Sequence, residues 1–567
     1  MSSLRKFWVA LLWRLRTTRR VWGRSVARDT ELLLPRPLGP GAHGQIDVPG
    51  AGAEVSGSAL YARGWALFPS GPPARIELRL GEHSLGFARV GVSRPDMEER
   101  TGDALAGVCG FELTADLSEL PFPAGETTLR AVATGAGGEH HELPPVPLTL
   151  TEEEPDASLA PPAPRTPLPA GAGGRRVLVC THQLNLGGAQ LYLQDLLGEL
   201  VRQGGVEPTV VSALDGTLRG DLEAMGIPVH ISSLVPLDDL SSHVGRVEEL
   251  AAWAEGREFE VAFVNTATAF TFPWAEAAAQ LGIPAVWAIH ESFPPPVLWG
   301  NLSPAVRRHA EAALAGAELA IFEADATRRL FEPPLREGHG LVLPYGLDLG
   351  PIDAMRDNFD RSATRRDLGI DEDAELVLCV GTVEPRKAQL PLAQAFGSVA
   401  ERHPRAKLVF VGGRDDTDTE ALEGFIEASE LRDQIEVIQV TPDVQPWYAV
   451  ADLLVCASDI ESLPRTVLEA MAYETPVLAT SVFGLPELIE DGATGWLCEP
   501  KDMPALAAAL DRALSSSSEE RREIGRAGRA LVKRRHALDA YGREVGRLLV
   551  QAADRGTAKQ ATHATSE

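Results

Sequence analysis

Two patterns of apolar residues divide the chain. Between residues 46 and 150, short segments alternate apolar and polar side chains, as in ARIELRLG (residues 74–81), and turns rich in Gly and Pro separate them. Alternation with a period of two indicates half-buried β-strands, and several short strands at this spacing are typical of an all-β sandwich. We therefore predict a β-sandwich module over residues 46–150.

From residue 175 the apolar residues form uninterrupted runs instead. Runs such as VAFVN (residues 261–265) and KLVFVGG (residues 407–413) are separated by segments with helical periodicity. Such runs indicate strands buried on both faces of a parallel sheet that helices cover. One series ends near PYGLD (residues 344–348) and a second begins near residue 375. The pattern predicts two doubly wound, Rossmann-like α/β domains, over residues 175–348 and 349–550.

The segments outside these domains differ in composition. Residues 151–174 are rich in Pro, Ala and Gly, which is typical of a semi-extended linker. Residues 551–567 are expected to form a disordered tail.

The N-terminal segment, residues 1–45, begins with a basic amphipathic stretch. Its first 28 residues carry eight Arg or Lys and no acidic residue. The apolar run at residues 7–13 is far shorter than the roughly 20 residues needed to span a bilayer. Residues 1–28 are therefore expected to make a peripheral contact with anionic lipid at the inner face of the membrane. The alternatives are a disordered basic tail or a helix that docks on the protein's own acidic surface.

Charge and cysteine content limit the classes of function. The net charge is −27, and without the eight basic residues of the N-terminal stretch it is −35. This acidity argues against a nucleic-acid-binding protein. The five cysteines are widely scattered and include no C-x-x-C pair, so neither a disulfide framework nor a zinc site is indicated. A reducing, cytoplasmic location fits best.

The candidate chemistry centres on DIESLPRTVLEAMAYETPVLATSVFGLPELIEDGATGWL, residues 459–497. Glu461 and Glu469 stand eight residues apart, on either side of a predicted helix start. A buried strand, PVLAT, follows the helix. In open α/β sheets, ligands bind at the carboxyl ends of the strands, and a helix N-terminus offers free N–H groups to an anion. The stretch therefore predicts a binding site for an anionic ligand with hydroxyl groups.

This E-x7-E string, with its EAMA segment, PV-containing strand and G-x-PE-x-I-x-DG-x-x-G segment, resembles the donor-site signature of retaining glycosyltransferases of family 4. The resemblance covers about residues 175–550 and implies the GT-B fold, a pair of Rossmann-like domains with a cleft between them. It implies transfer of a sugar from a nucleotide diphosphate sugar to a hydroxyl, without a metal or other cofactor. The acceptor would be an unknown glycan or lipid-linked molecule.

The resemblance assigns roles within the second domain. Glu469 matches the glutamate that binds the ribose, and Glu461 matches the glutamate near the transferred sugar. Leu463, Arg465 and Thr466 would offer backbone contacts to phosphate and sugar.

Loops that flank the E-x7-E stretch depart from the family pattern at several positions. In GTVEPRKAQ (residues 381–389), Lys387 matches the family's lysine and Arg386 would supply a second charge to the diphosphate. Thr382 stands where the family usually has an arginine, and Ala388 replaces the usual glycine after the lysine. Phe483 likewise replaces the first glycine of a usual pair.

Further candidates lie elsewhere in the two predicted domains. Gly187 and Gly188 match the family's G-G-A loop beside donor and acceptor. His290 matches a cleft histidine, to which we assign positioning of the substrates instead of proton abstraction. Gly413 is expected near the nucleotide base. The loop at residues 291–301 is interpreted as an apolar acceptor wall because of its prolines and tryptophan.

Three alternatives stay open on the sequence alone. A D-x-D pattern at residues 415–418 would bind a metal in another glycosyltransferase architecture, but Asp and Thr also commonly cap helices. Trp65 of the β-sandwich could be a sugar platform or a core residue. The whole protein could be a glycosyltransferase of cell-surface glycan or glycolipid synthesis, a nucleotide-sugar epimerase, or a non-catalytic protein that binds glycans or nucleotide sugars.

Overall fold

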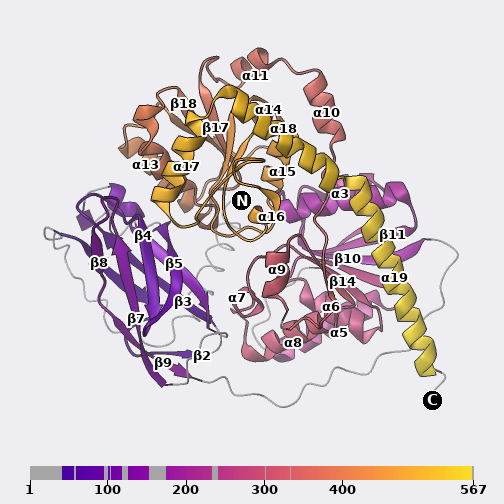
Figure 1. Cartoon of the computed structure of the whole chain (residues 1–567). Helices are drawn as coiled ribbons and strands as arrows, with labels where there is room; N and C mark the ends of the chain where they lie inside the picture. Colours follow the sequence, from indigo (N-terminus) through magenta and orange to yellow (C-terminus); the bar gives the residue numbers. More distant parts are fainter. Residues whose placement is uncertain are drawn as a thin grey trace, which may run out of the picture.

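The computed structural model describes residues 41–151, 174–232 and 240–564, with short gaps at 57–58, 93, 95–96, 98–99, 102–103, 118–124, 301 and 333. Figure 1 shows an N-terminal β-module beside two α/β domains, the second domain above the first. The basic stretch at residues 1–28 and nearly all of the expected linker lie outside the described residues.

The N-terminal β-module, residues 41–151, is a single continuous sheet of nine strands. Eight of them follow the order β1-β3-β6-β5-β4-β7-β9-β2, and β8 pairs with β7. The pairs are antiparallel except β2 with β9, which is parallel. The strands are β1 (His43–Val48), β2 (Ala53–Ser56), β3 (Ala59–Leu67), β4 (Arg75–Leu80), β5 (His83–Val92), β6 (Gly110–Asp116), β7 (Gly125–Thr134), β8 (His140–Glu142) and β9 (Val146–Thr151).

The apolar positions of these strands alternate as the sequence predicts. In β4, Ile76, Leu78 and Leu80 are fully buried in one core with Phe111, while the residues between them are not. The all-β class is confirmed, and the sheet closes nearly into a barrel around this core. Trp65 is buried in a smaller cluster of the module with Met97, Ala106 and Cys109, so it is a core residue and its ring is not a platform for a sugar.

The first α/β domain has a seven-stranded parallel sheet of order β12-β11-β10-β13-β14-β15-β16. Its strands are β10 (Arg175–Gln183), β11 (Val206–Leu214), β12 (Val229–Ile231), β13 (Val261–Asn265), β14 (Ala285–Ile289), β15 (Leu319–Phe322) and β16 (Gly340–Val342). The helices are α3 (Gly188–Gln203), α4 (Arg219–Ala224), α5 (Leu240–Ala254), α6 (Phe272–Gln280), α7 (Pro295–Leu298), α8 (Pro304–Ala315) and α9 (Asp325–Leu330). The strand order reverses between β10 and β13, where ligands bind in sheets of this kind.

The second α/β domain repeats the design with a parallel sheet of order β19-β18-β17-β20-β21-β22. Its strands are β17 (Glu375–Val380), β18 (Ala406–Gly413), β19 (Ile435–Gln439), β20 (Leu453–Cys456), β21 (Val477–Thr480) and β22 (Trp496–Cys498). The helices are α10 (Gly350–Asp357), α11 (Arg361–Asp367), α12 (Gln389–Gly397), α13 (Thr417–Ala428), α14 (Gln445–Val450), α15 (Arg465–Ala472), α16 (Leu485–Leu488), α17 (Met503–Ser515) and α18 (Ser518–Arg535). The expected pair of doubly wound domains is confirmed.

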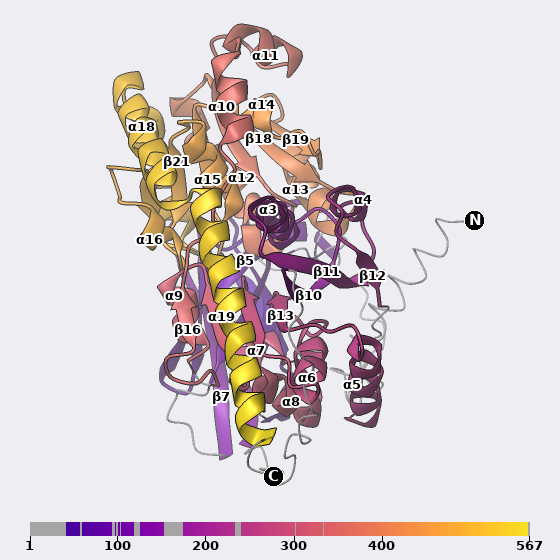
Figure 2. The same cartoon turned by 90° about the vertical axis from the view of Figure 1, so that its right-hand side faces the viewer.

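The last helix, α19 (Leu538–Ala564), crosses from the second domain back to the first and packs on α3 and β13 (Figure 1, Figure 2). Ala552 and Ala553 are buried in that contact, and the Tyr541 hydroxyl lies 2.6 Å from the Tyr192 hydroxyl. Most of the expected disordered tail is therefore helical, and Ala552 and Ala553 at its start have a surface to cover. In the described part of the chain, no helix is both long and apolar enough to cross a membrane.

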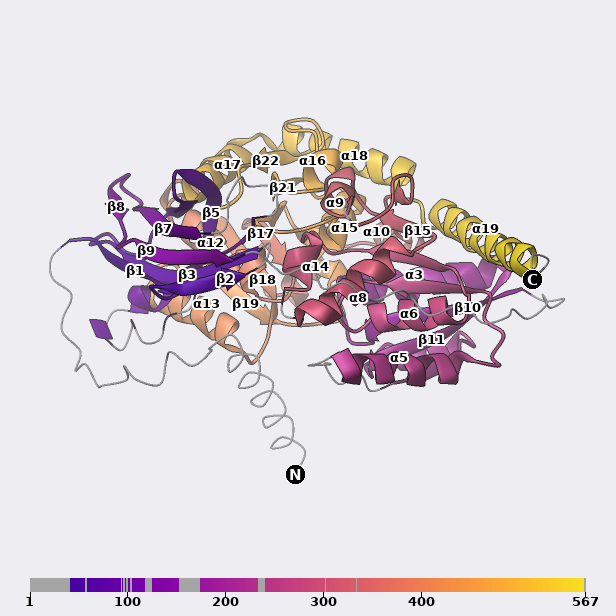
Figure 3. The same ribbon diagram turned by 90° about the horizontal axis from the view of Figure 1, so that it is seen from below.

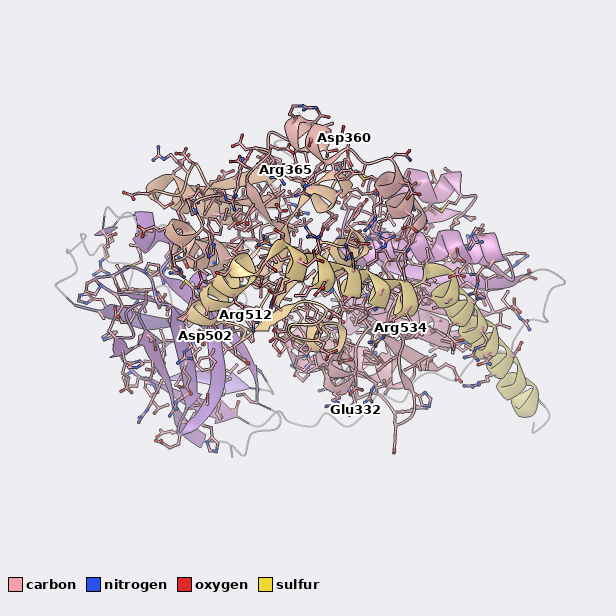
Figure 4. All side chains as sticks on the ribbon, turned by 45° about the horizontal axis from the view of Figure 1, so that its top comes forward. Glu332, Asp360, Arg365, Asp502, Arg512 and Arg534 are labelled. Carbon is pink, nitrogen blue, oxygen red and sulfur yellow. The ribbon has the colours of Figure 1, made fainter. Side chains whose placement is uncertain are left out.

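The β-module is docked beside the second domain, and the first domain extends the other way (Figure 3). The 3-10 helix η1 (Ala104–Val108) of the β-module packs on α13 of the second domain. Strand β5 of the module lies against α12 and the 3-10 turn η2 (Pro385–Lys387). Arg75 Nη1 lies 3.3 Å from an oxygen of Asp502, which Figure 4 labels at the edge of the module. The module thus contacts the very turn that carries two candidate site residues.

Candidate functional site

The candidate residues gather where the carboxyl edges of the two parallel sheets meet. On the second domain, three loops face the junction, following the neighbouring strands β17, β20 and β21. On the first domain, the facing residues lie at the carboxyl ends of β13, β14 and β15, which are also neighbours. Parallel strands bring the ends of successive loops to one edge, so residues far apart in sequence meet here.

Glu461 lies at the centre of the second-domain side. It is 8% exposed, and its Oε1 accepts hydrogen bonds from Lys387 Nζ, from Arg386 Nη1 at 3.3 Å and from Ser458 Oγ at 3.1 Å. Burial alone would raise the pKa of this carboxyl, but the charges of Lys387 and Arg386 hold the pKa below its ordinary value. The structure therefore brings two predicted site residues, Lys387 and Arg386, onto one carboxylate oxygen of a third, Glu461.

The turn that carries both cations has a left-handed residue directly after Lys387. Ala388 has φ +53°, in the region that normally favours glycine. The resemblance expects a glycine at this position, so the backbone of the turn keeps the glycine conformation although the residue has changed. Gln389 closes the turn by donating from its side-chain amide to the Thr382 carbonyl at 2.9 Å.

The same substitution pattern recurs in the loop after β21. Phe483, at the place of an expected glycine, has φ +42°. The next residue, Gly484, has a different reason to lack a side chain. A Cβ atom on Gly484 would lie 2.3 Å from the Ser462 carbonyl oxygen and 2.7 Å from Ala324 Cβ of the first domain. Gly484 thus permits close approach of the two domains at the site.

Arg465 is the first residue of α15, and Glu469 lies one turn further along the helix. Arg465 Nε donates to Glu469 Oε1 at 2.7 Å, and Arg465 Nη1 donates to Asp195 Oδ2 of the first domain at 2.6 Å. Burial would lower the pKa of this guanidinium, but the two carboxylates raise the pKa well above its ordinary value. Thr466 is the second residue of the helix. The predicted ribose-binding glutamate is therefore already paired.

Leu463 contributes backbone groups, as expected, but both contact the first domain. Its N–H donates to Glu323 Oε2 at 3.2 Å, and its carbonyl oxygen accepts from the Tyr345 hydroxyl at 3.2 Å. Further along the junction, the Thr327 and Ser462 hydroxyls lie 3.1 Å apart. The loop before α15 is thus held by hydrogen bonds across the domain boundary.

His290 directly follows β14 and is engaged through both ring nitrogens. Its Nδ1 lies 2.5 Å from Glu323 Oε1, and its Nε2 lies 2.9 Å from Asn265 Oδ1. The ring meets Tyr192 edge to face at 4.5 Å. Burial lowers the pKa of the imidazole, but the Glu323 carboxylate outweighs it and raises the pKa above its ordinary value.

The glycine loop after β10 forms the N-terminus of α3. Gly187 is the N-cap residue, with an extended backbone, and Gly188 has open space where a Cβ would point. Beside them, the Gln190 side chain contacts His182 Nε2 at 3.2 Å. Burial, together with nearby His290, lowers the pKa of His182 to about 4.

Gly413 ends β18 on the second-domain side. Its neighbour Gly412 has φ +139° and lies so close to the β17 loop that a Cβ would be 2.2 Å from the Gly381 carbonyl oxygen. Gly413 therefore lies at the same sheet edge as Lys387. No hydrogen bond of the described residues links it directly to the other candidate residues.

The sequence interpretation missed Ser458 of the second domain, which donates to Glu461, and four polar partners from the first domain. These four are Asp195, Asn265, Glu323 and Tyr345. A signal existed for two of them: Asn265 is the last residue of β13 and Glu323 directly follows β15, as His290 follows β14. Polar residues at the ends of three successive buried strands predict a shared site.

Two other sequence interpretations are settled by side-chain placement. Trp299, read as part of an apolar acceptor wall, is fully buried and donates to the Ala267 carbonyl at 2.8 Å. That interpretation of the tryptophan is wrong, since the ring belongs to the core of the first domain. Asp416 of the D-x-D pattern caps α13 by accepting from the Thr419 N–H at 2.9 Å, which is the helix-cap alternative.

Within the described ranges, one group of potential metal ligands comes together, far from the domain junction. His243 of α5, Glu276 of α6 and His309 of α8 place ligand atoms within 4.8 Å of one another. Each histidine approaches Glu276 at 2.5–2.6 Å, a hydrogen-bond distance, whereas ligands on one zinc ion lie about 3.3 Å apart. The remaining ring nitrogens also lack the carboxylate or carbonyl partner that zinc-bound histidines use. The group is therefore a hydrogen-bonded triad.

The fold and the junction define a GT-B protein: two Rossmann-like sheets whose carboxyl edges face each other, preceded here by the β-module. Solved structures with this architecture include Anabaena HepE in complex with UDP, with a TM-score of 0.56 at 21% identity over 66% of this chain and all of that one. A glycosyltransferase from Rickettsia africae gives a TM-score of 0.57 at 17% identity over 67% of this chain and 98% of the other. At these identities the likeness concerns the fold.

Sequence comparison gives the family. Residues 186–350 match the family model described as Glycosyltransferase Family 4, and residues 360–531 match that of Glycosyl transferases group 1. The chain belongs to the family 4 glycosyltransferases, and neither match extends into the β-module.

Curated relatives agree with this assignment. D-inositol 3-phosphate glycosyltransferase of Geodermatophilus obscurus is 33% identical over 41% of this chain and 52% of its own length. Spore coat protein SA of Bacillus subtilis is 32% identical over 30% of this chain and 46% of its own. The chain thus spans about half the length of these relatives.

Proposed function

We propose that the protein is a retaining, metal-independent glycosyltransferase that moves a sugar from a nucleotide diphosphate sugar to a hydroxyl acceptor. The observation that carries the proposal is the convergence of Lys387 and Arg386 on Glu461, beside the N-terminus of α15. Cations and helix N-termini at this place would stabilise the diphosphate that leaves as the glycosidic bond breaks. Glu461 would accept hydrogen bonds from the transferred sugar, and Glu469 from the ribose.

The engagement of His290 supports a positioning role in that reaction. Each ring nitrogen already faces a protein oxygen, so the ring has no free nitrogen to accept a proton from an acceptor hydroxyl. A retaining, front-side transfer does not require such a base. His290 would act by holding the edge of the first domain in place beside the donor.

The donor base and the acceptor are parts of the same proposal. HepE, which shares the fold, has been crystallised with UDP-glucose, so uridine diphosphate sugars are the first donors to test. The pathway we propose is synthesis of a cell-surface glycan or glycolipid at the cytoplasmic face of the membrane.

The test is incubation of the full chain with UDP- and GDP-sugars, followed by analysis of both nucleotide and sugar. Release of nucleoside diphosphate, abolished by Lys387→Ala, is expected. An isomerised sugar without release would identify an epimerase instead. Binding without turnover of any donor would identify a non-catalytic nucleotide-sugar-binding protein.

Membrane contact is the part of the proposal that concerns residues 1–28. Deleting them should remove binding to vesicles of phosphatidylglycerol and phosphatidylcholine, because eight positive charges are lost. A variant in which the eight Arg and Lys residues are changed to Gln tests the contribution of charge to membrane binding separately from that of the apolar run at residues 7–13. Unchanged partitioning of the deleted chain would contradict peripheral anchoring.

A further inference from the structure

Glu323 connects the two domains at the candidate site. It directly follows β15 and is 9% exposed. Its Oε1 lies 2.5 Å from His290 Nδ1 of the same domain, while its Oε2 accepts from the Leu463 N–H of the other domain at 3.2 Å. A carboxylate buried to this degree is unfavourable unless its oxygens are paired, and here each oxygen is paired with a different domain.

The His290 ring is fixed from its other side as well. The Asn265 amide nitrogen donates to the Ala189 carbonyl at 3.2 Å, so the amide oxygen of Asn265 is the atom that faces His290 Nε2. Both ring nitrogens therefore face oxygen acceptors. Neutral imidazole has one N–H donor and the imidazolium ion has two, so the charged form alone satisfies both contacts.

Charged and titratable groups surround the ring from four directions. Glu323 approaches from β15 and Glu291 follows in the chain, while His182 and Tyr192 approach from β10 and α3. Burial raises the pKa of Glu291, whose Oε2 accepts from the backbone N–H groups of Ala267 and His290 and makes no hydrogen bond to the ring. Burial lowers the pKa of His182 to about 4, so His182 is neutral near pH 7. The Glu323 carboxylate is thus the counter-ion that touches the ring.

The segment that begins at Glu323 also docks along the second domain. The Glu487 carboxylate of α16 accepts from the Asp325 and Ala326 N–H groups at 3.0 and 2.8 Å. These contacts hold the start of α9 against α16 of the second domain. Glu323 differs from Glu487 because its carboxylate also contacts His290.

We propose that Glu323 is a positioning residue that keeps His290 in its doubly protonated form and ties that ring to the backbone of the donor loop. The His290 ring and α15, the helix that bears Glu469, are then held in fixed positions relative to each other across the domain boundary. The consequence for sugar transfer rests on the proposed function, but the link between Glu323 and His290 does not.

The test replaces Glu323 by Gln, which keeps the size of the side chain and removes its charge. The His290 titration is followed by NMR in full-length protein with isotope-labelled histidine, and its resonance is assigned from the spectrum of His290→Asn. We expect the ring to titrate lower by about one pH unit or more. The control is Glu332→Gln, which should leave the titration unchanged. Glu332, labelled in Figure 4, is an exposed glutamate of the same domain, and it pairs with Arg328.

Turnover is measured on the same samples as nucleoside diphosphate release from UDP-sugars. Glu323→Gln should lower kcat by 10-fold or more and change the donor KM less, while Glu332→Gln changes neither. An unchanged His290 titration in Glu323→Gln overturns the proposal, whatever the turnover. A shifted titration with full turnover overturns the role in transfer. If the wild-type chain releases no nucleotide, the proposed function fails and the NMR result still decides the link between Glu323 and His290.

Discussion

Replacing Lys387 by Met should destabilise the fold because it leaves a buried carboxylate short of a partner. Glu461 is 8% exposed and the Lys387 side chain is 17% exposed. Losing one member of a buried ion pair costs about 3–5 kcal/mol. Arg386 remains at 3.3 Å, but its side chain is 38% exposed, so it offsets part of the loss. We therefore expect the free energy of unfolding to fall by about 2–3 kcal/mol at neutral pH.

The pH dependence of this loss follows from Glu461. Its pKa is held below the ordinary 4.5 in the folded protein, so the ionised carboxylate stabilises the fold above that pH, and the contribution disappears as the pH falls through the folded pKa. Without Lys387, burial raises the pKa of Glu461, and the stabilisation by its ionised carboxylate is largely absent at every pH. The difference between wild type and Lys387→Met should therefore be largest near pH 7 and shrink below pH 4.

The assay is urea unfolding at pH 7.5 and at pH 3. The matched control is Lys407→Met, since Lys407 pairs at 2.7 Å with Glu436 of the same domain, whose side chain is 43% exposed, and its loss should stay below about 1 kcal/mol. Equal losses for the two variants, or a Lys387 effect that persists in acid, would refute the reasoning. Nucleoside diphosphate release from the same samples should fall by about 10²–10³-fold in Lys387→Met.

Three further substitutions test other contacts. Gly484→Ala should lower the free energy of unfolding by about 1–3 kcal/mol because a Cβ meets backbone at 2.3 Å; Gly424→Ala, in open space on α13, should raise it by about 0.5–1 kcal/mol, and equal effects would contradict the close approach. Burial raises the pKa of Asp459 to about 6, so Asp459→Asn should raise the free energy of unfolding by up to about 3 kcal/mol at pH 7.5 and little at pH 4; a gain independent of pH would exclude the charge as its cause. Tyr541→Phe removes the 2.6 Å hydrogen bond to Tyr192 and should lower the stability by about 1 kcal/mol, and a thermal midpoint equal to wild type would show that α19 does not depend on that contact.

The fold could be predicted from the sequence because its strands carry unambiguous patterns. In β4 the alternation of Ile76, Leu78 and Leu80 with charged residues matches the observed burial. The runs in β13 and β17 are buried almost throughout, as strands covered on both faces must be. Periodicity predicts which residues face a core, and for these elements that is sufficient to give the architecture.

Residue identity misled the interpretation where backbone conformation mattered. Ala388 and Phe483 depart from the glycines that the resemblance expects, yet both adopt positive φ. A left-handed residue other than glycine is strained by roughly 1–2 kcal/mol, which surrounding contacts must offset. Ala388 is buried beside α12, so packing supplies that compensation. Such compensation comes from the tertiary structure and leaves no local signal.

Pairs between distant segments were the part that the sequence did not reveal. Asp195 and Arg465 are 270 residues apart, and Glu323 and Leu463 are 140 residues apart. Periodicity and caps describe a residue relative to its own element, so they place each of these side chains at a sheet edge without naming its partner. The interpretation of Trp299 as part of an acceptor wall was wrong for the same reason, because the composition of a loop does not tell which way a ring points.

The ion pairs within the site indicate which residue could compensate for Thr382, which stands where the family usually has an arginine. Both cations of the β17 loop already contact Glu461, and Arg465 already contacts Asp195 and Glu469. A diphosphate that enters this site competes with protein carboxylates for every one of these charges. Arg386 has the most exposed side chain of the three cations, so reorienting it toward a ligand carries the smallest desolvation and packing penalty. We therefore expect Arg386 to supply the charge that an arginine at position 382 would have given.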